Sequence, residues 1–238
     1  MEERFIREEM LLGHKAMERL AAAHVAVYGL GGVGGNAAEA LVRGGIGRLT
    51  LIDGDTVAPS NINRQAFALQ STVGLPKTEA AARRLLDINP SLELELKQGM
   101  YLPESREEFF VACDYIVDAI DMVTAKLDLI ETALSRGVPV ISSLGTGNKL
   151  DPSRLQVADI SETRICPLAR VMRRELRKRG IEHLCVVFSE EEPLVPRFQP
   201  NEEPGTAIRR ATPGSVSWVP PAAGLLLAGH VIVSLVGS

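Results

Sequence analysis

Hydrophobic and polar positions follow two periods along the first part of the chain. Short apolar runs of strand length lie near residues 24–29, 48–53, 92–97, 114–118 and 138–143. Between them, apolar residues recur at the three- and four-residue spacing of amphipathic helices, near 33–44, 77–88, 104–111 and 123–136. Helical spacing also covers residues 5–22. This alternation predicts an α/β fold with a doubly wound, mostly parallel sheet that carries helices on both faces.

The pattern changes after residue 146. Strand-like runs at 154–160 and 184–188 flank a helix at roughly 167–179, and we expect these strands to form a different, antiparallel layer. Residues 197–214 are polar and contain several Pro and Gly, which predicts a mobile loop. The second half therefore adds an antiparallel extension to the parallel core.

An apolar run over residues 221–236 ends the pattern and predicts a helix buried against the sheet. The run is slightly short for a bilayer span and lacks flanking cations, so we do not expect stable membrane insertion, although C-terminal membrane association stays open. We expect one domain over 1–238, with a nucleotide-binding core at 1–145 and a substrate-side extension with the C-terminal helix at 146–238.

Composition narrows the class of protein. The 238 residues are 45% hydrophobic and 24% charged, as in a soluble globular domain that can bury a large core. A formal charge of −4 argues against nonspecific coating of nucleic acid. The three cysteines are too few and too widely spaced for a disulfide framework, and together with a charged start they favour the reduced cytoplasm.

A glycine-rich turn between the first two predicted elements indicates nucleotide binding. It reads Gly29-Leu30-Gly31-Gly32-Val33-Gly34, between a strand and a helix, and Asp53 ends the next strand. Such glycines let the backbone approach a phosphate, whose charge then meets the N–H groups at the start of the helix. The acid after the second strand binds ribose hydroxyls in this fold, although Asp53 is also open to interpretation as a surface turn residue.

Residues 61–77 supply a second group, which shifts the prediction from NAD to ATP. Arg64 and Lys77 carry the charges that neutralise a triphosphate, and Lys77 begins a predicted helix after Gly74-Leu75-Pro76. Alone, each would be a solvated surface charge. Together with the glycine turn they predict a phosphate cradle. Its members, with the neighbouring polar residues, are Asp55, Asn61, Arg64, Gln65 and Lys77.

A third group follows the apolar strand at 114–118. Asp118 and Asp121 lie where that strand ends, at the edge of the sheet that faces the ligand crevice. A hard cation bound to phosphates needs only one or two carboxylates, so Asp121 is the predicted Mg²⁺ ligand. The alternative is that Asp121 caps the following helix, while Asp118 braces the strand.

These groups together resemble the ubiquitin-activating-enzyme-like superfamily of adenylating enzymes. The match covers about residues 4–145 and combines the glycine turn with Asp53-x-Asp55, Asn61-x-Asn63-Arg64-Gln65, Gly74-x-x-Lys77 and Asp118-x-x-Asp121. The resemblance implies adenylation of a carboxylate with ATP. It also implies a homodimer in which Arg7 of one subunit reaches the nucleotide of the other.

The second half resembles the tRNA threonylcarbamoyladenosine dehydratase branch of that superfamily. The resemblance rests on 155–160, Pro167-Leu168-Ala169, 187–191 and Pro213-Gly214-Ser215. It implies that the chain uses ATP and Mg²⁺ to adenylate the threonyl carboxylate of a modified adenosine in tRNA and to cyclise it. Arg7, Arg64, Lys77 and Asp121 are then the catalytic residues, and a sulfur-relay protein stays open as a partner.

Two other functions stay open. Cys166 stands where that branch often has Asp, and as a thiol nucleophile it would indicate an activating enzyme for a ubiquitin-like sulfur carrier. Carrier-activating relatives usually hold zinc in two Cys-x-x-Cys pairs, which this chain lacks, and a lone Cys is usually inert. The glycine turn alone also fits an NAD-dependent oxidoreductase.

The helix predicted at 167–179 is strongly basic on one face. In an otherwise acidic chain this face is the predicted contact for tRNA phosphates, although it also fits an ordinary solvated surface. Its candidate tRNA-binding residues are Arg170, Arg173, Arg174, Arg177 and Lys178. Arg209 and Arg210 in the polar loop are expected to add to it or to approach the substrate carboxylate.

Overall fold

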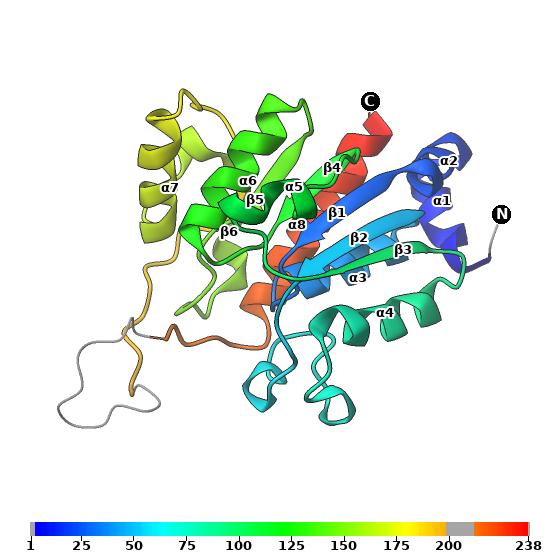
Figure 1. Cartoon of the computed structure of the whole chain (residues 1–238), viewed down its shortest axis with the longest axis horizontal. Helices are drawn as coiled ribbons and strands as arrows, with labels where there is room; N and C mark the ends of the chain where they lie inside the picture. The colour runs from blue at the N-terminus through cyan, green and yellow to red at the C-terminus, as the bar shows by residue number, and fades with distance from the viewer. Residues whose placement is uncertain (1–2, 199–211, 238) are drawn as a thin grey trace.

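A computed structural model describes residues 3–198 and 212–237 of the chain (Figure 1). Its centre is one seven-stranded sheet of order β3-β2-β1-β4-β5-β7-β6, in which all neighbours are parallel except β6 and β7. The strands are β1 His24–Tyr28, β2 Arg48–Asp53, β3 Glu93–Gln98, β4 Tyr115–Asp118, β5 Val140–Ser143, β6 Leu155–Asp159 and β7 Cys185–Ser189. The predicted α/β class and the mostly parallel, doubly wound sheet are therefore confirmed.

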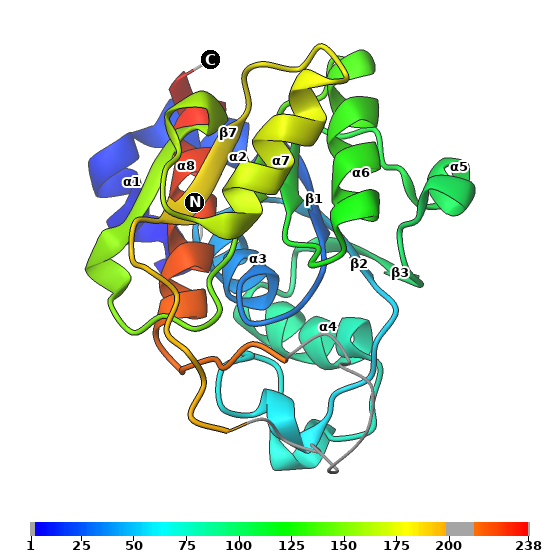
Figure 2. The same cartoon turned by 90° about the vertical axis from the view of Figure 1, so that its left-hand side faces the viewer.

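Helices cover both faces of the sheet (Figure 2). One hydrophobic core lies beneath α2, α3, α4 and α8, and a second lies beneath α5, α6 and α7. The helices are α1 Ile6–Leu12, α2 His14–Ala22, α3 Gly34–Arg43, α4 Lys77–Ile88, α5 Arg106–Phe109, α6 Val123–Ser135, α7 Pro167–Arg177 and α8 Val219–Gly237.

The strand order reverses between β1 and β4. From β1 the chain runs outwards through α3 to β2, and from β4 it runs the other way through α6 to β5. The loops that leave the carboxyl ends of β1 and β4 therefore separate and open a crevice between them, which is where ligands bind in sheets of this kind.

Two predicted helices differ from the structure. The helix expected over 5–22 is broken at Gly13, whose φ of 85° ends α1 before α2 begins. The helix expected at 104–111 is shortened to α5, because Phe110 and Val111 leave it to join the core, where the Val111 N–H donates to the Tyr28 hydroxyl.

Contrary to the prediction, the strands of the second half do not form a separate layer. Instead β7 pairs in parallel with β5, and β6 pairs antiparallel with β7, so both extend the central sheet. The antiparallel extension is thus confirmed, while its separation from the core sheet is wrong. The physical reason is that β5 is buried and pairs with β4 on one side only. Its other edge needs a second strand to satisfy its backbone hydrogen-bonding groups, and β7 provides it. The predicted loop at 197–214 lies mostly outside the described residues, as do Arg209 and Arg210.

The apolar C-terminal helix α8 packs on the sheet and on α3. Ala223, Leu227 and Val231 on one side are fully buried, whereas Leu225 and Val233 on the other are 58% and 65% exposed. By length and composition α8 would also pass as a membrane span, but 44% of its most apolar window is buried inside the protein. One face of α8 is therefore part of the core.

Candidate active site

One cavity of about 570 Å³ lies at the point where the strand order reverses. Its size suits a nucleotide-sized ligand. Its walls come from the glycine turn after β1, the end of β2, the start of α4, the loop after β4, the loop after β5 and residues 213–215 before α8. Gly29, Gly31, Gly32, Asp53, Asp55, Asn61, Arg64, Gln65, Lys77 and Asp121 all line this cavity.

Two glycines of the turn are required by close backbone approaches. Gly29 has a φ of 87°, and a Cβ placed on it would lie 2.7 Å from the Ala119 carbonyl oxygen. A Cβ on Gly34 would lie 1.8 Å from the Gly29 carbonyl oxygen. Gly34 does not line the cavity. It lets α3 begin directly against the turn, so that the first N–H groups of the helix face the crevice.

Asp53 braces the glycine turn from the end of β2. Its carboxylate accepts the Leu30 N–H at 2.6 Å and the Asp55 N–H at 2.8 Å, and the residue is only 9% exposed. The alternative of a surface turn residue is therefore wrong. Asp53 thus fixes the backbone beside the cavity, and it also forms part of the cavity wall.

Lys77 begins α4 as predicted, but its charge is neutralised locally. Its Nζ lies 2.7 Å from Asp55 Oδ2 and 3.8 Å from Asp53 Oδ2, and the side chain is almost fully buried. Lys77 and Asp55 were predicted to belong to the same phosphate cradle, but their ion pair was not predicted. A phosphate in the cavity would compete with Asp55 for the ammonium.

Arg64, by contrast, has no carboxylate partner among the described residues. Its Nη1 donates to the Ser60 carbonyl oxygen at 3.0 Å and to Asn63 Oδ1 at 2.9 Å. Partial burial lowers the pKa of the Arg64 guanidinium, because the charged form loses hydration. The stem of Arg64 lies against Gly32, where a Cβ would come within 3.1 Å of Arg64 Cγ. An unneutralised cation in a phosphate-sized cavity is suited to binding an anion.

The polar residues around Arg64 mainly shape its loop. Asn61 Oδ1 accepts the Ala58 N–H at 3.0 Å, and Gln65 is 8% exposed at the cavity wall. Asn36 was not among the predicted site residues. Its Nδ2 donates to the Gly32 carbonyl oxygen at 2.7 Å and lies 3.4 Å from the Arg64 carbonyl oxygen. Its position in the first turn of α3, directly after the glycines, could have indicated this role from the sequence.

Asp121 lies exposed in the loop after β4 and does not cap α6, whose N-cap residue is Met122. Within the described residues no group of three or more His, Cys, Asp or Glu side chains is arranged to hold a metal ion. Any cation here would therefore need further oxygens, from a bound ligand and from water, besides the Asp121 carboxylate. That requirement fits a magnesium ion bound mainly to phosphates.

Other wall residues were not predicted as site residues. Tyr101 is 3% exposed, and its hydroxyl donates to Asp128 Oδ2 at 2.8 Å. Burial raises the pKa of Tyr101 to about 12, so its hydroxyl remains a neutral hydrogen-bond donor. The segment 143–147 and residues 213–215 also line the cavity. Tyr101 lies just after β3, so its position near the end of a strand was predictable. Its place in the cavity wall was not, because that depends on how distant parts of the chain pack together.

Arg7 lies outside this cavity. It is exposed on α1, which Figure 1 shows beside α2 and the start of β1, whereas the cavity lies where the parallel strands end. Arg7 therefore does not take part in the cavity of its own chain.

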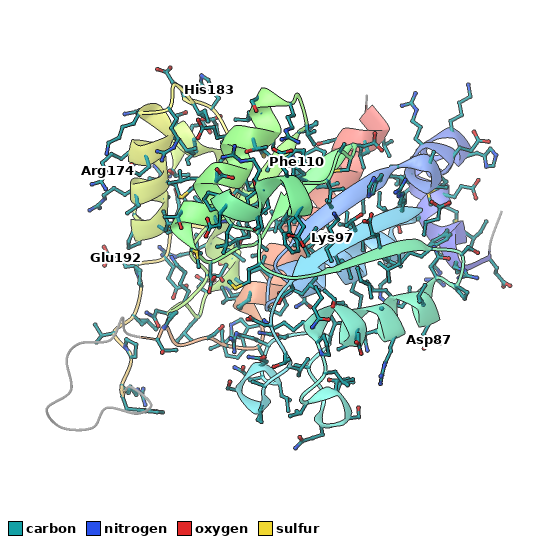
Figure 3. The ribbon with its side chains drawn as sticks, viewed as in Figure 1. Asp87, Lys97, Phe110, Arg174, His183 and Glu192 are labelled. Atoms are coloured by element: carbon teal, nitrogen blue, oxygen red, sulfur yellow. The ribbon has the colours of Figure 1, made fainter. Side chains whose placement is uncertain are left out.

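The basic face of α7 begins at the mouth of the cavity. Leu168 in the first turn of α7 lines the cavity, and the helix runs away from it. Arg173 is held to the structure, since it donates to Thr163 Oγ1 at 2.6 Å. Arg174, labelled in Figure 3, extends outwards and pairs with Glu175, as does Lys178. Arg170 and Arg177 are exposed and have no ion pair with a described residue.

Cys166 is buried and does not line the cavity. The residue is 2% exposed at the N-cap position of α7, and a Cβ on Gly145 would lie 3.5 Å from its sulfur. A nucleophile that accepts an acyl group must reach the reacting carbonyl. The position of Cys166 therefore counts against the carrier-activating alternative. Burial also raises the pKa of Cys113 to about 12 and that of Cys185 to about 11.

Comparison with known proteins agrees with this geometry. The model of the ThiF family matches residues 5–238. The tRNA threonylcarbamoyladenosine dehydratase of Bacillus subtilis (strain 168) is 45% identical over 238 residues, covering 97% of this chain and 94% of the relative. The crystal structure of the Escherichia coli enzyme, TcdA, in complex with ATP superposes with a TM-score of 0.87 at 34% identity, covering 99% of this chain and 94% of that one.

A carrier-activating relative matches less of the chain. The molybdopterin-synthase adenylyltransferase of Salmonella typhimurium is 34% identical over 141 residues, which cover 58% of this chain and 57% of the relative. The likeness to the dehydratases thus extends through the second half of the chain, where the basic helix α7 and the helix α8 lie.

Proposed function

The chain belongs to the ThiF family, and from this premise we propose that it is an ATP-dependent tRNA threonylcarbamoyladenosine dehydratase. Relatives of this name match it over nearly its whole length, and TcdA has been crystallised with ATP and with AMP in the same fold. The chain is therefore an ATP-binding, tRNA-modifying enzyme. The activating-enzyme and oxidoreductase alternatives have no comparable support.

The single observation that carries the proposal at the level of residues is Arg64. It places a cation without a carboxylate partner among the described residues in a cavity lined by the glycine turn. A nicotinamide dinucleotide carries fewer phosphate charges, and nothing in its hydride chemistry calls for an arginine here. A triphosphate that undergoes attack at a phosphorus does call for it, because charge builds up on the phosphoryl oxygens.

The proposed chemistry has two steps. The threonyl carboxylate of the modified adenosine attacks the α-phosphorus of ATP, the bond to the β-phosphate oxygen breaks, and pyrophosphate leaves. A nitrogen of the same side chain then attacks the adenylated carbonyl, loses its proton and expels AMP. We assign Arg64, Lys77 and the partner's Arg7 to stabilising the phosphate charge, and Asp53, Asp55, Asn61 and Gln65 with the glycines to binding the nucleotide. The second step is intramolecular, so it depends on orientation more than on a protein nucleophile.

Mg²⁺ is the proposed cofactor, with Asp121 as its protein ligand. The exposed carboxylate at the cavity wall and the need for further oxygens from a ligand support this assignment. When bound, the ion would neutralise phosphate charge. Asp121 itself would orient it relative to the attacking carboxylate.

We further propose a homodimer. Arg7 does not line the cavity of its own chain, and exposed apolar residues accompany it on α1, with Met10 79% and Leu11 88% exposed. Apolar side chains that stay exposed in one chain suit an interface with a second copy. A dimer would bring Arg7 of one subunit to the nucleotide of the other.

For tRNA, we propose that the basic face of α7 contacts phosphates. The face begins at the cavity mouth and comprises Arg170, Arg173, Arg174, Arg177 and Lys178, of which Arg170 and Arg177 are the least engaged within the chain. We also propose a cytoplasmic enzyme made of one domain, since strands from both halves share one sheet. A sulfur-relay partner stays a prediction on which no described feature bears.

The test is direct. Purified protein with ATP, Mg²⁺ and tRNA bearing threonylcarbamoyladenosine should yield a nucleoside lighter by one water, detected by mass spectrometry, together with AMP and pyrophosphate. Unmodified tRNA should give no pyrophosphate. The Asp121→Ala variant should lose pyrophosphate release by at least about a hundredfold while it keeps the wild-type melting temperature. A wild-type enzyme that leaves the nucleoside mass unchanged would contradict the proposed function.

A further inference from the structure

A buried ion pair lies directly beneath the cavity without forming part of its wall. Lys126 in α6 and Asp118 at the end of β4 are both completely buried, and neither lines the cavity. Taking two charges out of water is costly, and an apolar pair of similar size would serve stability equally well or better. The pair therefore calls for an explanation other than the stability of the core.

All hydrogen-bonding groups of the pair are in use. Lys126 Nζ donates to Asp118 Oδ2 at 2.7 Å, to the Ser143 carbonyl oxygen at 2.9 Å and to Ser142 Oγ at 3.1 Å. Asp118 also accepts the Ser142 hydroxyl at 2.6 Å and the Ile120 N–H at 3.1 Å. The three protons of the ammonium thus have three acceptors, and the network is fully satisfied.

The network joins two segments of the cavity wall, which follow the neighbouring strands β4 and β5. Through the Ile120 N–H it holds the loop after β4, which carries Asp121. Through the carbonyl oxygen of Ser143, the last residue of β5, it holds the segment 143–147, which also lines the cavity. One buried ammonium thereby ties together two lining segments that are far apart in the sequence.

We propose that Lys126 and Asp118 are positioning residues for adenylation, which set the Asp121 carboxylate against the 143–147 loop. The proposal rests on the proposed function for its chemistry, but the loop positions that it concerns do not depend on that function. A fully hydrogen-bonded charge pair has one preferred geometry, whereas apolar side chains in the same space tolerate several. The pair therefore determines the geometry of the cavity wall in addition to filling space in the core.

The test uses the double variant Asp118→Asn/Lys126→Met, which removes both charges while it keeps the volume and an acceptor for the Ile120 N–H. We expect a melting temperature close to that of the wild type and nearly unchanged ATP affinity by calorimetry. We also expect a fall of at least about tenfold in kcat for pyrophosphate release and a similar rise in the Mg²⁺ concentration needed for half-maximal rate. Hydrogen–deuterium exchange should increase in the peptides that contain 119–122 and 143–147.

The matched control is Leu129→Ala, which weakens the packing of the same helix at a residue that neither lines the cavity nor takes part in the network. It should lower the melting temperature and leave the Mg²⁺ requirement and the exchange of both loops unchanged. Wild-type kcat, Mg²⁺ requirement and loop exchange in the double variant would overturn the proposal. So would a double variant that fails to fold, because the pair would then act on stability. If the wild type itself shows no turnover, the proposed function fails, and the exchange measurement still decides this inference.

Discussion

At the scale of single residues, the two cationic side chains of the cavity, Lys77 and Arg64, differ in whether they already have an anionic partner. Lys77 already has a carboxylate, Asp55, at 2.7 Å, whereas Arg64 binds only neutral oxygens. Binding a phosphate therefore costs Lys77 an existing ion pair and costs Arg64 nothing comparable. Arg64 should consequently provide most of the initial attraction for the nucleotide, while Lys77 changes partner as the phosphates settle.

A second property at this scale is the response of stability to pH. Burial lowers the pKa of His230, because the protonated ring loses hydration. The unfolded chain then takes up a proton near pH 6.5 and the folded chain only at lower pH, so the free energy of unfolding should fall as the pH drops through this window. Urea titrations between pH 7.5 and 5 should show a shallower fall for His230→Gln. Its control, His183→Gln, removes an exposed ring and should keep the wild-type slope; equal slopes for all three proteins would contradict the assignment.

At the scale of elements, α8 and α3 touch through a glycine. A Cβ on Gly224 would lie 2.4 Å from the Val33 carbonyl oxygen and 2.9 Å from the Ala37 nitrogen. Val33 belongs to the glycine turn, so the position of α8 is coupled to the nucleotide site. Gly229, five residues later on the same helix, has no atom within 4 Å of such a Cβ.

These two glycines form a matched pair for mutation. Gly224→Ala should lower the free energy of unfolding by about 1–3 kcal/mol through overpacking and should weaken ATP binding. Gly229→Ala should instead raise that free energy by up to about 1 kcal/mol, because Ala favours the helix and meets no neighbour. Denaturant titration and calorimetry with ATP measure both effects. Similar stability changes in the two variants would show that α8 does not press on the glycine turn.

The basic helix α7 gives a second prediction at this scale. Reversing Arg170 and Arg177 to Glu should weaken tRNA binding roughly tenfold to a hundredfold and flatten its salt dependence, while ATP affinity stays unchanged. The control reverses Lys15 and Arg83, which are exposed on other helices, so the net charge changes equally. Filter binding at several salt concentrations provides the measurement. Equal losses in both variants would make the effect one of net charge and not of this helix.

How far the sequence predicted the molecule also depends on scale. The glycine turn, Asp53, Arg64 and Asp121 lie in short motifs at the ends of strands, and parallel strands bring such ends to one edge, so their meeting in one cavity was predictable. The pairing of Lys126 with Asp118 and Ser142 was not, because it depends on which side chains α6 turns towards the sheet. Likewise, no local pattern showed that β7 would join β5 in the same sheet.

At the scale of the whole molecule, the proposed dimer makes each active site a product of two chains. Mixing Arg7→Ala with Asp121→Ala should then restore activity, because a mixed dimer contains one site with Asp121 and a partner's Arg7. With random assortment the recovery should reach about a quarter of wild-type activity. Mixing Arg64→Ala with Asp121→Ala should restore none, since both residues line the same cavity. Absence of recovery in the first mixture would place Arg7 outside the active site.

The contact between α8 and the glycine turn also bears on how the enzyme is made. Translation produces the turn early and α8 late, yet Pro220 and Gly224 of α8 pack against Gly32 and Val33. While α8 is still inside the exit tunnel of the ribosome, the turn lacks the surface on which it rests. We therefore expect the growing chain to bind nucleotide firmly only after α8 has packed against the turn.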